Sequence, residues 1–161
     1  MANDTDTAIR ENLIWLLEGG HAHAKFDDAV ADFPSDRAGI RPKGASHSAW
    51  EILEHMRIAQ NDILRFSLSG DYVSPGWPEG YWPAGPVPED NDGWRQSVRD
   101  FRKDLAEFVS LIRDPERDIY KKFPWGNGQS LLREALLMAD HNSYHLGELV
   151  LVRRLLGFWP R

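Results

Sequence analysis

Four segments of this sequence repeat apolar residues at intervals of three and four, the spacing that places side chains on one face of an α-helix. They cover approximately residues 7–30, 48–66, 92–112 and 130–157. No stretch of useful length alternates apolar and polar residues, as a half-buried strand does. The chain is therefore predicted to be all-α, and a four-helix bundle is the favoured architecture.

Local signals indicate where these helices begin and end. Ser48 and Glu51 have the spacing of a capping box at the start of the second helix. Asp92 is the expected N-cap of the third helix. The Gly19–Gly20 pair, inside the first pattern, is interpreted as a place where another helix approaches closely.

The longest segment without helical periodicity, residues 72–93, carries five prolines and two tryptophans. A connection of this length lets the second and third helices run parallel, so a four-helix bundle with a long crossover connection between helices 2 and 3 is expected. Trp77, Tyr81 and Trp82 are interpreted as anchors that hold this loop on the bundle. The alternative is that they line the mouth of a ligand site.

Size and charge limit the classes of function. With 161 residues and no internal repeat, residues 1–161 are expected to form a single domain. The formal net charge of −6 and the pI near 5.5 argue against binding to nucleic acid or to an anionic membrane. No apolar run approaches the ~18 residues of a membrane span, and the first residues lack the pattern of a secretory leader. A cytoplasmic protein is expected.

The sequence contains no cysteine, so a transition-metal site must use imidazole and carboxylate groups. His141 and His145 are four residues apart and can present two imidazoles on one helix face. They share a stripe with Leu137, Met138, Leu149 and Val152. His55 has the same kind of position in the second helix. One metal ion would satisfy all three rings, although three separately hydrogen-bonded histidines remain the alternative.

The other histidines are weaker candidates. His21 and His23 are two residues apart, which places them on different sides of a helix, although His23 can face the core. His47 precedes the second helix and is expected to be exposed. Asn142 occupies the position at which a helical zinc-protease motif has its general base, so that mechanism is disfavoured. The glutamates of a ferritin-like di-iron motif are also missing.

Two glutamates have the spacing of supporting groups. Glu51 lies four residues before His55 and Glu148 three after His145, so either can accept a hydrogen bond from an imidazole or move a proton. Each also has a structural alternative, as a helix cap or as an ion-pair partner of an arginine. Asp140 and Tyr144 share another helix face, where they can bond to each other.

Taken in order, "HSAWEILEHMRIAQNDIL", "GWPEGYWP", "FPWGNGQSLL" and "ADHNSYHLGELVLVRRLLG" resemble the DinB/YfiT-like superfamily over nearly the whole chain. The resemblance implies a helical bundle that holds a divalent metal ion through one histidine of the second helix and a His-x-x-x-His pair of the last. His55, His141 and His145 occupy those positions, and the ion can be zinc, nickel or iron. Homodimers are common in this superfamily.

Three nitrogen ligands would leave a coordination position open, as in catalytic rather than structural zinc sites. Members of the superfamily include transferases that use low-molecular-weight thiols. The expected function is therefore a metal-dependent enzyme that activates a thiol or water, as a thiol S-transferase or a hydrolase acting on a small molecule. The alternative is a binding or sensor module that carries a metal or small ligand without turnover.

Overall fold

The computed structural model describes residues 4–90 and 92–159, and its regular elements are helical over these residues. Five α-helices follow in order: α1 (Asp4–Glu18), α2 (Phe26–Val30), α3 (Ala49–Leu68), α4 (Gly93–Arg113) and α5 (Leu131–Leu155). Two short 3₁₀ helices, η1 (Ser35–Arg37) and η2 (Glu79–Tyr81), lie in the connections. The predicted all-α class is confirmed.

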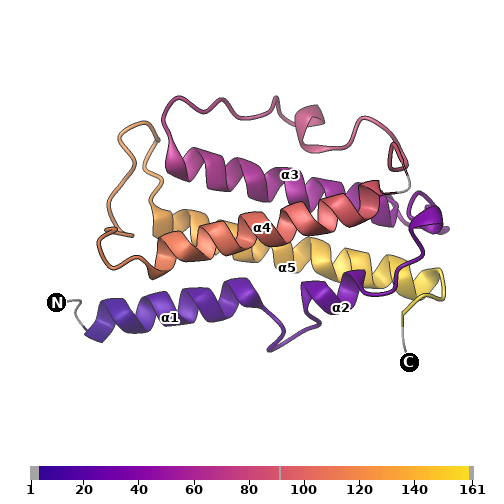
Figure 1. The fold of residues 1–161 in the computed structure, drawn as a ribbon, viewed down its shortest axis with the longest axis horizontal. Helices are drawn as coiled ribbons and strands as arrows, with labels where there is room; N and C mark the ends of the chain where they lie inside the picture. Colours follow the sequence, from indigo (N-terminus) through magenta and orange to yellow (C-terminus); the bar gives the residue numbers. More distant parts are fainter. Residues whose placement is uncertain (1–3, 91, 160–161) are drawn as a thin grey trace.

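The four long helices lie side by side (Figure 1). α3 packs against α4 and α5, and α1 packs against the same two helices. The segment between α3 and α4 runs back along α3 before α4 begins, so α3 and α4 point in the same direction (Figure 1). η2 lies in this segment and contacts α3. This return path lays the Trp- and Pro-rich loop along α3 (Figure 1).

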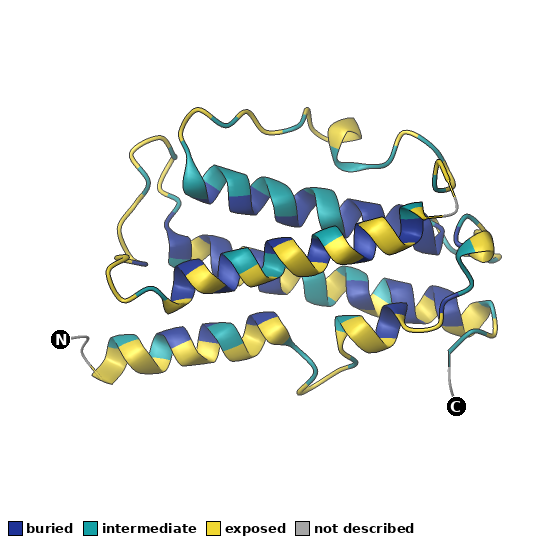
Figure 2. Cartoon of the chain, viewed as in Figure 1, coloured by how far each residue is buried: buried dark blue, intermediate teal, exposed yellow. Residues whose placement is uncertain are grey.

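Each long helix buries one face, shown in dark blue in Figure 2. One apolar cluster includes Met56, Phe101 and Leu149, and a second includes Phe108 and Met138. Phe108, Met56, Met138 and Leu149 are completely shielded from solvent. Burying each such side chain stabilises the fold by roughly 1.5–3 kcal/mol. The histidine-bearing parts of α3 and α5 are thus fixed by a well-packed core.

The expectation of one continuous first helix is wrong, because α1 ends at Glu18 and α2 begins only at Phe26. The backbone has positive φ angles of 66° at Gly19 and 81° at Gly20, which side chains other than glycine rarely adopt. Among the described residues, none lies within 4 Å of where a Cβ at Gly19 would be, and the Lys25 side chain occupies the space beside Gly20. The glycine pair therefore ends a helix and turns the chain.

The caps of the other helices follow the sequence more closely. Ser48 accepts a hydrogen bond from the backbone of Glu51 while the Glu51 carboxylate accepts one from Ser48. Ser130 caps α5 by accepting a hydrogen bond from the backbone N–H of Arg133. Asp92 has the N-cap position of α4, but its side chain makes no capping hydrogen bond and pairs with arginines instead.

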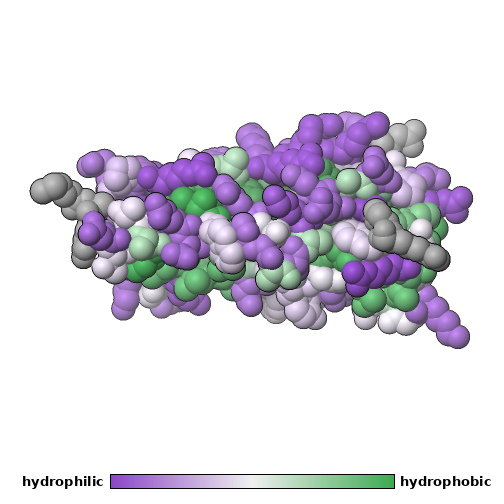
Figure 3. Space-filling model, turned by 90° about the horizontal axis from the view of Figure 1, so that it is seen from below, coloured by the Kyte–Doolittle hydropathy of each residue, from purple (hydrophilic) through white to green (hydrophobic). Residues whose placement is uncertain are grey.

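α5 has apolar side chains on both of its faces. Leu137 was expected on the inward stripe but is 43% exposed, on the outer face of the helix. Apolar residues also reach the surface elsewhere, as the green areas among purple ones in Figure 3 show. Even so, within residues 4–90 and 92–159, no helix is long and apolar enough to cross a membrane.

Candidate metal centre

Three imidazole rings meet between α3 and α5. His55 points from α3 toward α5, and His141 and His145 come from successive turns of α5. Because α3 and α5 pack directly against each other, the four-residue spacing on α5 sets two rings opposite the one from α3. His55 is 5% exposed, the His145 side chain is 12% exposed, and His141 is partly buried.

The rings face one another through the same nitrogen. His55 Nε2 lies 3.1 Å from His145 Nε2 and 3.0 Å from His141 Nε2. Among the described residues, these three form the one group of His, Asp or Glu side chains with its ligand atoms within 4.8 Å of one another. The sequence pattern had paired two of these residues by spacing, and the fold brings in the third.

The outer nitrogens of two rings are held by hydrogen-bond acceptors. His55 Nδ1 lies 2.8 Å from the backbone carbonyl of Tyr81, and His145 Nδ1 lies 2.6 Å from Glu148 Oε2. A carbonyl can only accept, so His55 Nδ1 carries the proton, and an ionised Glu148 requires the same of His145. In neutral rings, the lone pairs of both Nε2 atoms therefore point inward.

Burial keeps the imidazole rings of His55 and His141 neutral. It lowers the pKa of His141 to about 4, with a further contribution from neighbouring His145 and His55. Burial also lowers the pKa of His55, against a hydrogen bond from its ring to the Tyr81 carbonyl. At neutral pH these two imidazoles are bases with free lone pairs.

The cluster has too few protons to place a hydrogen bond in each of its short N–N contacts. A metal ion bound by the nitrogens would replace those hydrogen bonds. Only His141 can place a proton among the three Nε2 atoms, and one proton cannot serve both contacts of His55. Two nitrogens bound to one ion at ~2.0–2.1 Å lie roughly 3.0–3.4 Å apart, close to the spacing observed. The donor set and its geometry fit a divalent transition metal.

Aromatic rings enclose the cluster on two sides. Trp82 stacks on His55 with ring centroids 4.1 Å apart, and His47 stacks on the indole of Trp82, also at 4.1 Å. Tyr144 meets His145 edge-on, with centroids 4.8 Å apart, and is 64% exposed. Trp82 thus both anchors the loop and forms a wall of the site.

Tyr81 attaches η2 to α3 at two points. Its carbonyl accepts from His55, and its hydroxyl donates to Asp62 Oδ2 at 2.8 Å. Burial and this hydrogen bond raise the pKa of Tyr81 to about 12, so the phenol keeps its proton. Trp77, by contrast, is 77% exposed, and its one aromatic contact among the described residues is with Tyr81, so it is not an anchor on the helices.

The other residues that the sequence suggested for the site do not take part in the histidine cluster. The Glu51 carboxylate is engaged by Ser48 and Arg41, and its hydrogen bonds do not reach the histidines. His23 is exposed rather than facing the core, and the exposed His21 stacks on Trp15. Within the described residues, no hydrogen bond joins Asp140 to Tyr144.

Several features beside the cluster were missed or misjudged from the sequence. His47 was expected to be exposed, but it is half-buried against Trp82. Asn142 donates to Gln60 Oε1 at 2.9 Å and so joins α5 to α3 beside the cluster. The Tyr81 carbonyl could not be found from a sequence pattern, because every residue has one. The Trp82 contact had a signal, since a tryptophan in a long proline-rich loop needs an apolar partner.

Comparison with known proteins gives one positive finding. The sequence model of the DinB superfamily matches residues 20–149, which include all three clustered histidines. Comparisons with curated proteins and with solved structures gave no match.

Proposed function

Because this chain belongs to the DinB superfamily, and because three imidazole Nε2 atoms converge in it, we propose that it binds one divalent transition metal ion through His55, His141 and His145. Zinc, nickel and iron all accept imidazole ligands. The observation that carries the proposal is the pair of Nε2 contacts at 3.0 and 3.1 Å, which too few protons are available to satisfy.

The proposed activity is that of a metal-dependent enzyme acting on a small molecule. A divalent ion at three imidazoles supplies Lewis acidity that lowers the pKa of a thiol or of water and makes it a nucleophile. The chain has no cysteine, so no thiol nucleophile comes from the protein itself. We favour a low-molecular-weight thiol as the nucleophile, and hence a thiol S-transferase over a hydrolase.

The chain's own residues would orient the ligands and limit the access of water. The Tyr81 carbonyl and Glu148 fix the tautomers of His55 and His145, which directs both lone pairs inward. Trp82 covers one face of His55. Glu148 is the carboxylate that contacts the cluster, and it can take up a proton from the His145 ring or pass one on.

A thiol assay on cobalt-loaded protein tests the reaction class. We expect a low-molecular-weight thiol to change the visible absorption of the bound cobalt. We also expect the protein to accelerate conjugation of the thiol to a chlorinated nitrobenzene. Both effects should be absent in His145→Ala and present in His23→Ala, which alters a histidine outside the cluster.

Two other outcomes would replace this assignment. Hydrolysis of small esters or amides with no response to thiols would favour activation of water. Metal binding with neither reaction would favour a non-catalytic binding or sensor module. One observation supports that alternative: Glu148 is already engaged by His145, and no free general base lies beside the cluster among the described residues.

The arrangement of α1, α3, α4 and α5 supports the four-helix bundle expected for this superfamily, with residues 69–92 as its crossover connection. We further propose that the chain forms a homodimer through the outer face of α5. Exposed apolar side chains recur there at helical spacing along the whole helix: Leu136, Leu137, Tyr144, Leu151 and Leu155.

Charge complementarity favours a second copy of the chain as the partner. Asp140 and Arg154 lie seven residues to either side of the exposed Gly147, on the same face of α5. Antiparallel pairing of two α5 helices near this glycine would bring Asp140 of each copy close to Arg154 of the other. Sedimentation should show a dimer, weakened in Asp140→Arg and restored in Asp140→Arg/Arg154→Asp. A monomer at all concentrations, or no restoration, would exclude this interface.

A further inference from the structure

Two of the three clustered histidines have a partner on their outer nitrogen, and the third makes no such contact. His55 and His145 are held through Nδ1 by the Tyr81 carbonyl and by Glu148. His141 Nδ1 is shielded from solvent, and among the described residues it makes no hydrogen bond of ordinary length and angle. What lies beside this atom decides whether the Nε2 of His141 presents a lone pair or a proton to the other two rings.

A chain of hydrogen bonds fixes the orientation of the Asn142 amide. The fully buried Gln60 donates through Nε2 to the backbone carbonyl of Phe101, 2.7 Å away. A carbonyl can only accept, so the other end of the Gln60 amide, Oε1, is the acceptor that faces Asn142. Asn142 donates to it through Nδ2 at 2.9 Å. The Asn142 Oδ1 atom is therefore held as an acceptor on the other branch of its amide.

The Oδ1 atom of Asn142 complements the Nδ1 atom of His141. Like that nitrogen, Oδ1 is shielded from solvent and has no hydrogen-bond partner of ordinary geometry among the described residues. His141 reaches His55 of α3, and its neighbour on α5 reaches Gln60 of the same helix. Burial lowers the pKa of His141, and hydrogen bonding with the Asn142 side chain opposes this shift, so the two side chains lie close together. A small rotation would pair two buried polar atoms that are each costly to leave without a partner.

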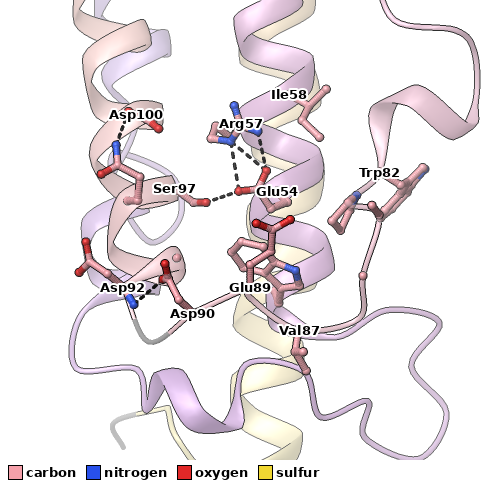
Figure 4. Close-up of a pocket in the computed structure, with 16 residues that line it drawn as sticks. Glu54, Arg57, Ile58, Trp82, Val87, Glu89, Asp90, Asp92, Ser97 and Asp100 are labelled. Atoms are coloured by element: carbon pink, nitrogen blue, oxygen red, sulfur yellow. Dashed lines mark hydrogen bonds and ion pairs between the residues drawn. The ribbon is translucent and has the colours of Figure 1, made fainter.

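The cavities near the cluster offer these two atoms no other partner. A cleft of about 600 Å³ between α3, α4 and the segment before α4 contains carboxylates such as Glu54 and Asp100 (Figure 4). Neither His141 nor Asn142 lines this cleft. Asn142 does border a narrow cavity of about 40 Å³ beside Phe101. Its Oδ1 is shielded from solvent, however, so water in that cavity does not reach it.

We infer that Asn142 is a positioning residue of the proposed metal centre: its Oδ1 accepts the Nδ1 proton of His141 and so directs the Nε2 lone pair of that ring toward the other two. This inference rests on the proposed function and deepens it. All three clustered histidines then carry their proton on Nδ1, and all three Nε2 atoms present lone pairs to one ion. Neither short N–N contact of His55 holds a hydrogen bond in this state, so a bound cation relieves the repulsion between the lone pairs.

The tautomer of His141 in the metal-free protein tests the inference directly. Long-range ¹H–¹⁵N correlation spectra at about pH 8, above the ordinary pKa of histidine, show which ring nitrogen carries the proton. We expect the Nδ1–H form for His141 in the chelator-treated wild type, as for His55 and His145, which serve as internal references. In Asn142→Leu the Nδ1 atom has no acceptor, so the proton should move to Nε2, where it can donate to His55. An Nε2–H form in the wild type, or the same form in both proteins, would overturn the inference.

Competition titration with zinc measures the consequence for the metal centre. Asn142→Leu should bind zinc about 10- to 100-fold more weakly than the wild type, the usual effect of losing the outer hydrogen-bond partner of a metal-bound histidine. Asn142→Asp keeps an acceptor for His141 but cannot donate to Gln60, so it should bind zinc at least as tightly as the wild type. Both variants lose the donor to Gln60, so a purely structural role of Asn142 predicts equal losses of affinity in the two.

The two measurements separate this inference from the proposed function. Equal losses of zinc affinity in Asn142→Leu and Asn142→Asp, or an unchanged affinity in Asn142→Leu, would overturn the positioning role. A wild-type protein that binds no zinc, nickel or ferrous iron would contradict the proposed function instead. The spectra of the metal-free protein would then still decide whether Asn142 sets the tautomer of His141.

Discussion

Acidification of the metal-free protein should destabilise it in a pH range set by the buried histidines. The pKa of His141 is about 4 in the fold, because burial disfavours its charged form, against about 6.5 in an unfolded chain. The unfolded state therefore takes up a proton first as the pH falls below 6.5, and stability is lost from there down to about pH 4. A difference of about 2.5 pKa units corresponds to about 3 kcal/mol for a fully shielded ring, and to nearer 2 kcal/mol for this half-buried one.

Urea unfolding with a chelator present, at several pH values between 7.5 and 4.5, measures this loss. The pKa of His55 is lowered as well, so its contribution has the same sign. His141→Gln is the matched control, because every other titrating group is common to both proteins. Asp6, whose pKa the hydrogen bond from Arg10 lowers, contributes only below about pH 4. Equal losses of stability in the wild type and in His141→Gln between pH 6.5 and 4.5 would refute the argument.

Four substitutions test other parts of the structure. Phe108→Ala removes a fully buried ring and should lower the free energy of unfolding by about 3–5 kcal/mol in urea titrations. Arg10→Met leaves three backbone carbonyls, in the last turn of α4 and in the loop that follows it, without their donor, and should cost about 2–4 kcal/mol. The exposed Arg113→Met should cost less than about 1 kcal/mol. Glu148→Gln weakens the acceptor of His145 and should reduce metal affinity about 10- to 100-fold in competition titrations, with unchanged circular dichroism.

The long helices could be predicted from the sequence because their apolar spacing is a local property. Ser48 and Ser130 marked the starts of α3 and α5 for the same reason. The break after Glu18 was missed because the Gly19–Gly20 pair was interpreted as a helix contact, whereas the positive φ angles show that it turns the chain. Leu137 was assigned to the inward face because α5 has apolar residues on both of its faces, and their spacing alone does not show which face is buried.

The sequence predicted the three histidines of the candidate site, but not the contacts that bring them together and surround them. Spacing placed His141 and His145 on one face, but the meeting with His55 depends on how α3 packs on α5. The walls depend on the return path of the loop, which brings Trp82 between His47 and His55. Contacts of this kind join residues far apart in the chain, and no local pattern encodes them.

The metal content of untagged protein, purified without added metal, tests the central claim most directly. Elemental analysis should find close to one zinc, nickel or iron ion per chain in the wild type and in His23→Ala. It should find almost none in His55→Ala or His141→Ala, with both variants still helical by circular dichroism. A wild-type protein that is empty and also fails to take up zinc, nickel or ferrous iron in titration would contradict the account, as would full retention of metal in His55→Ala.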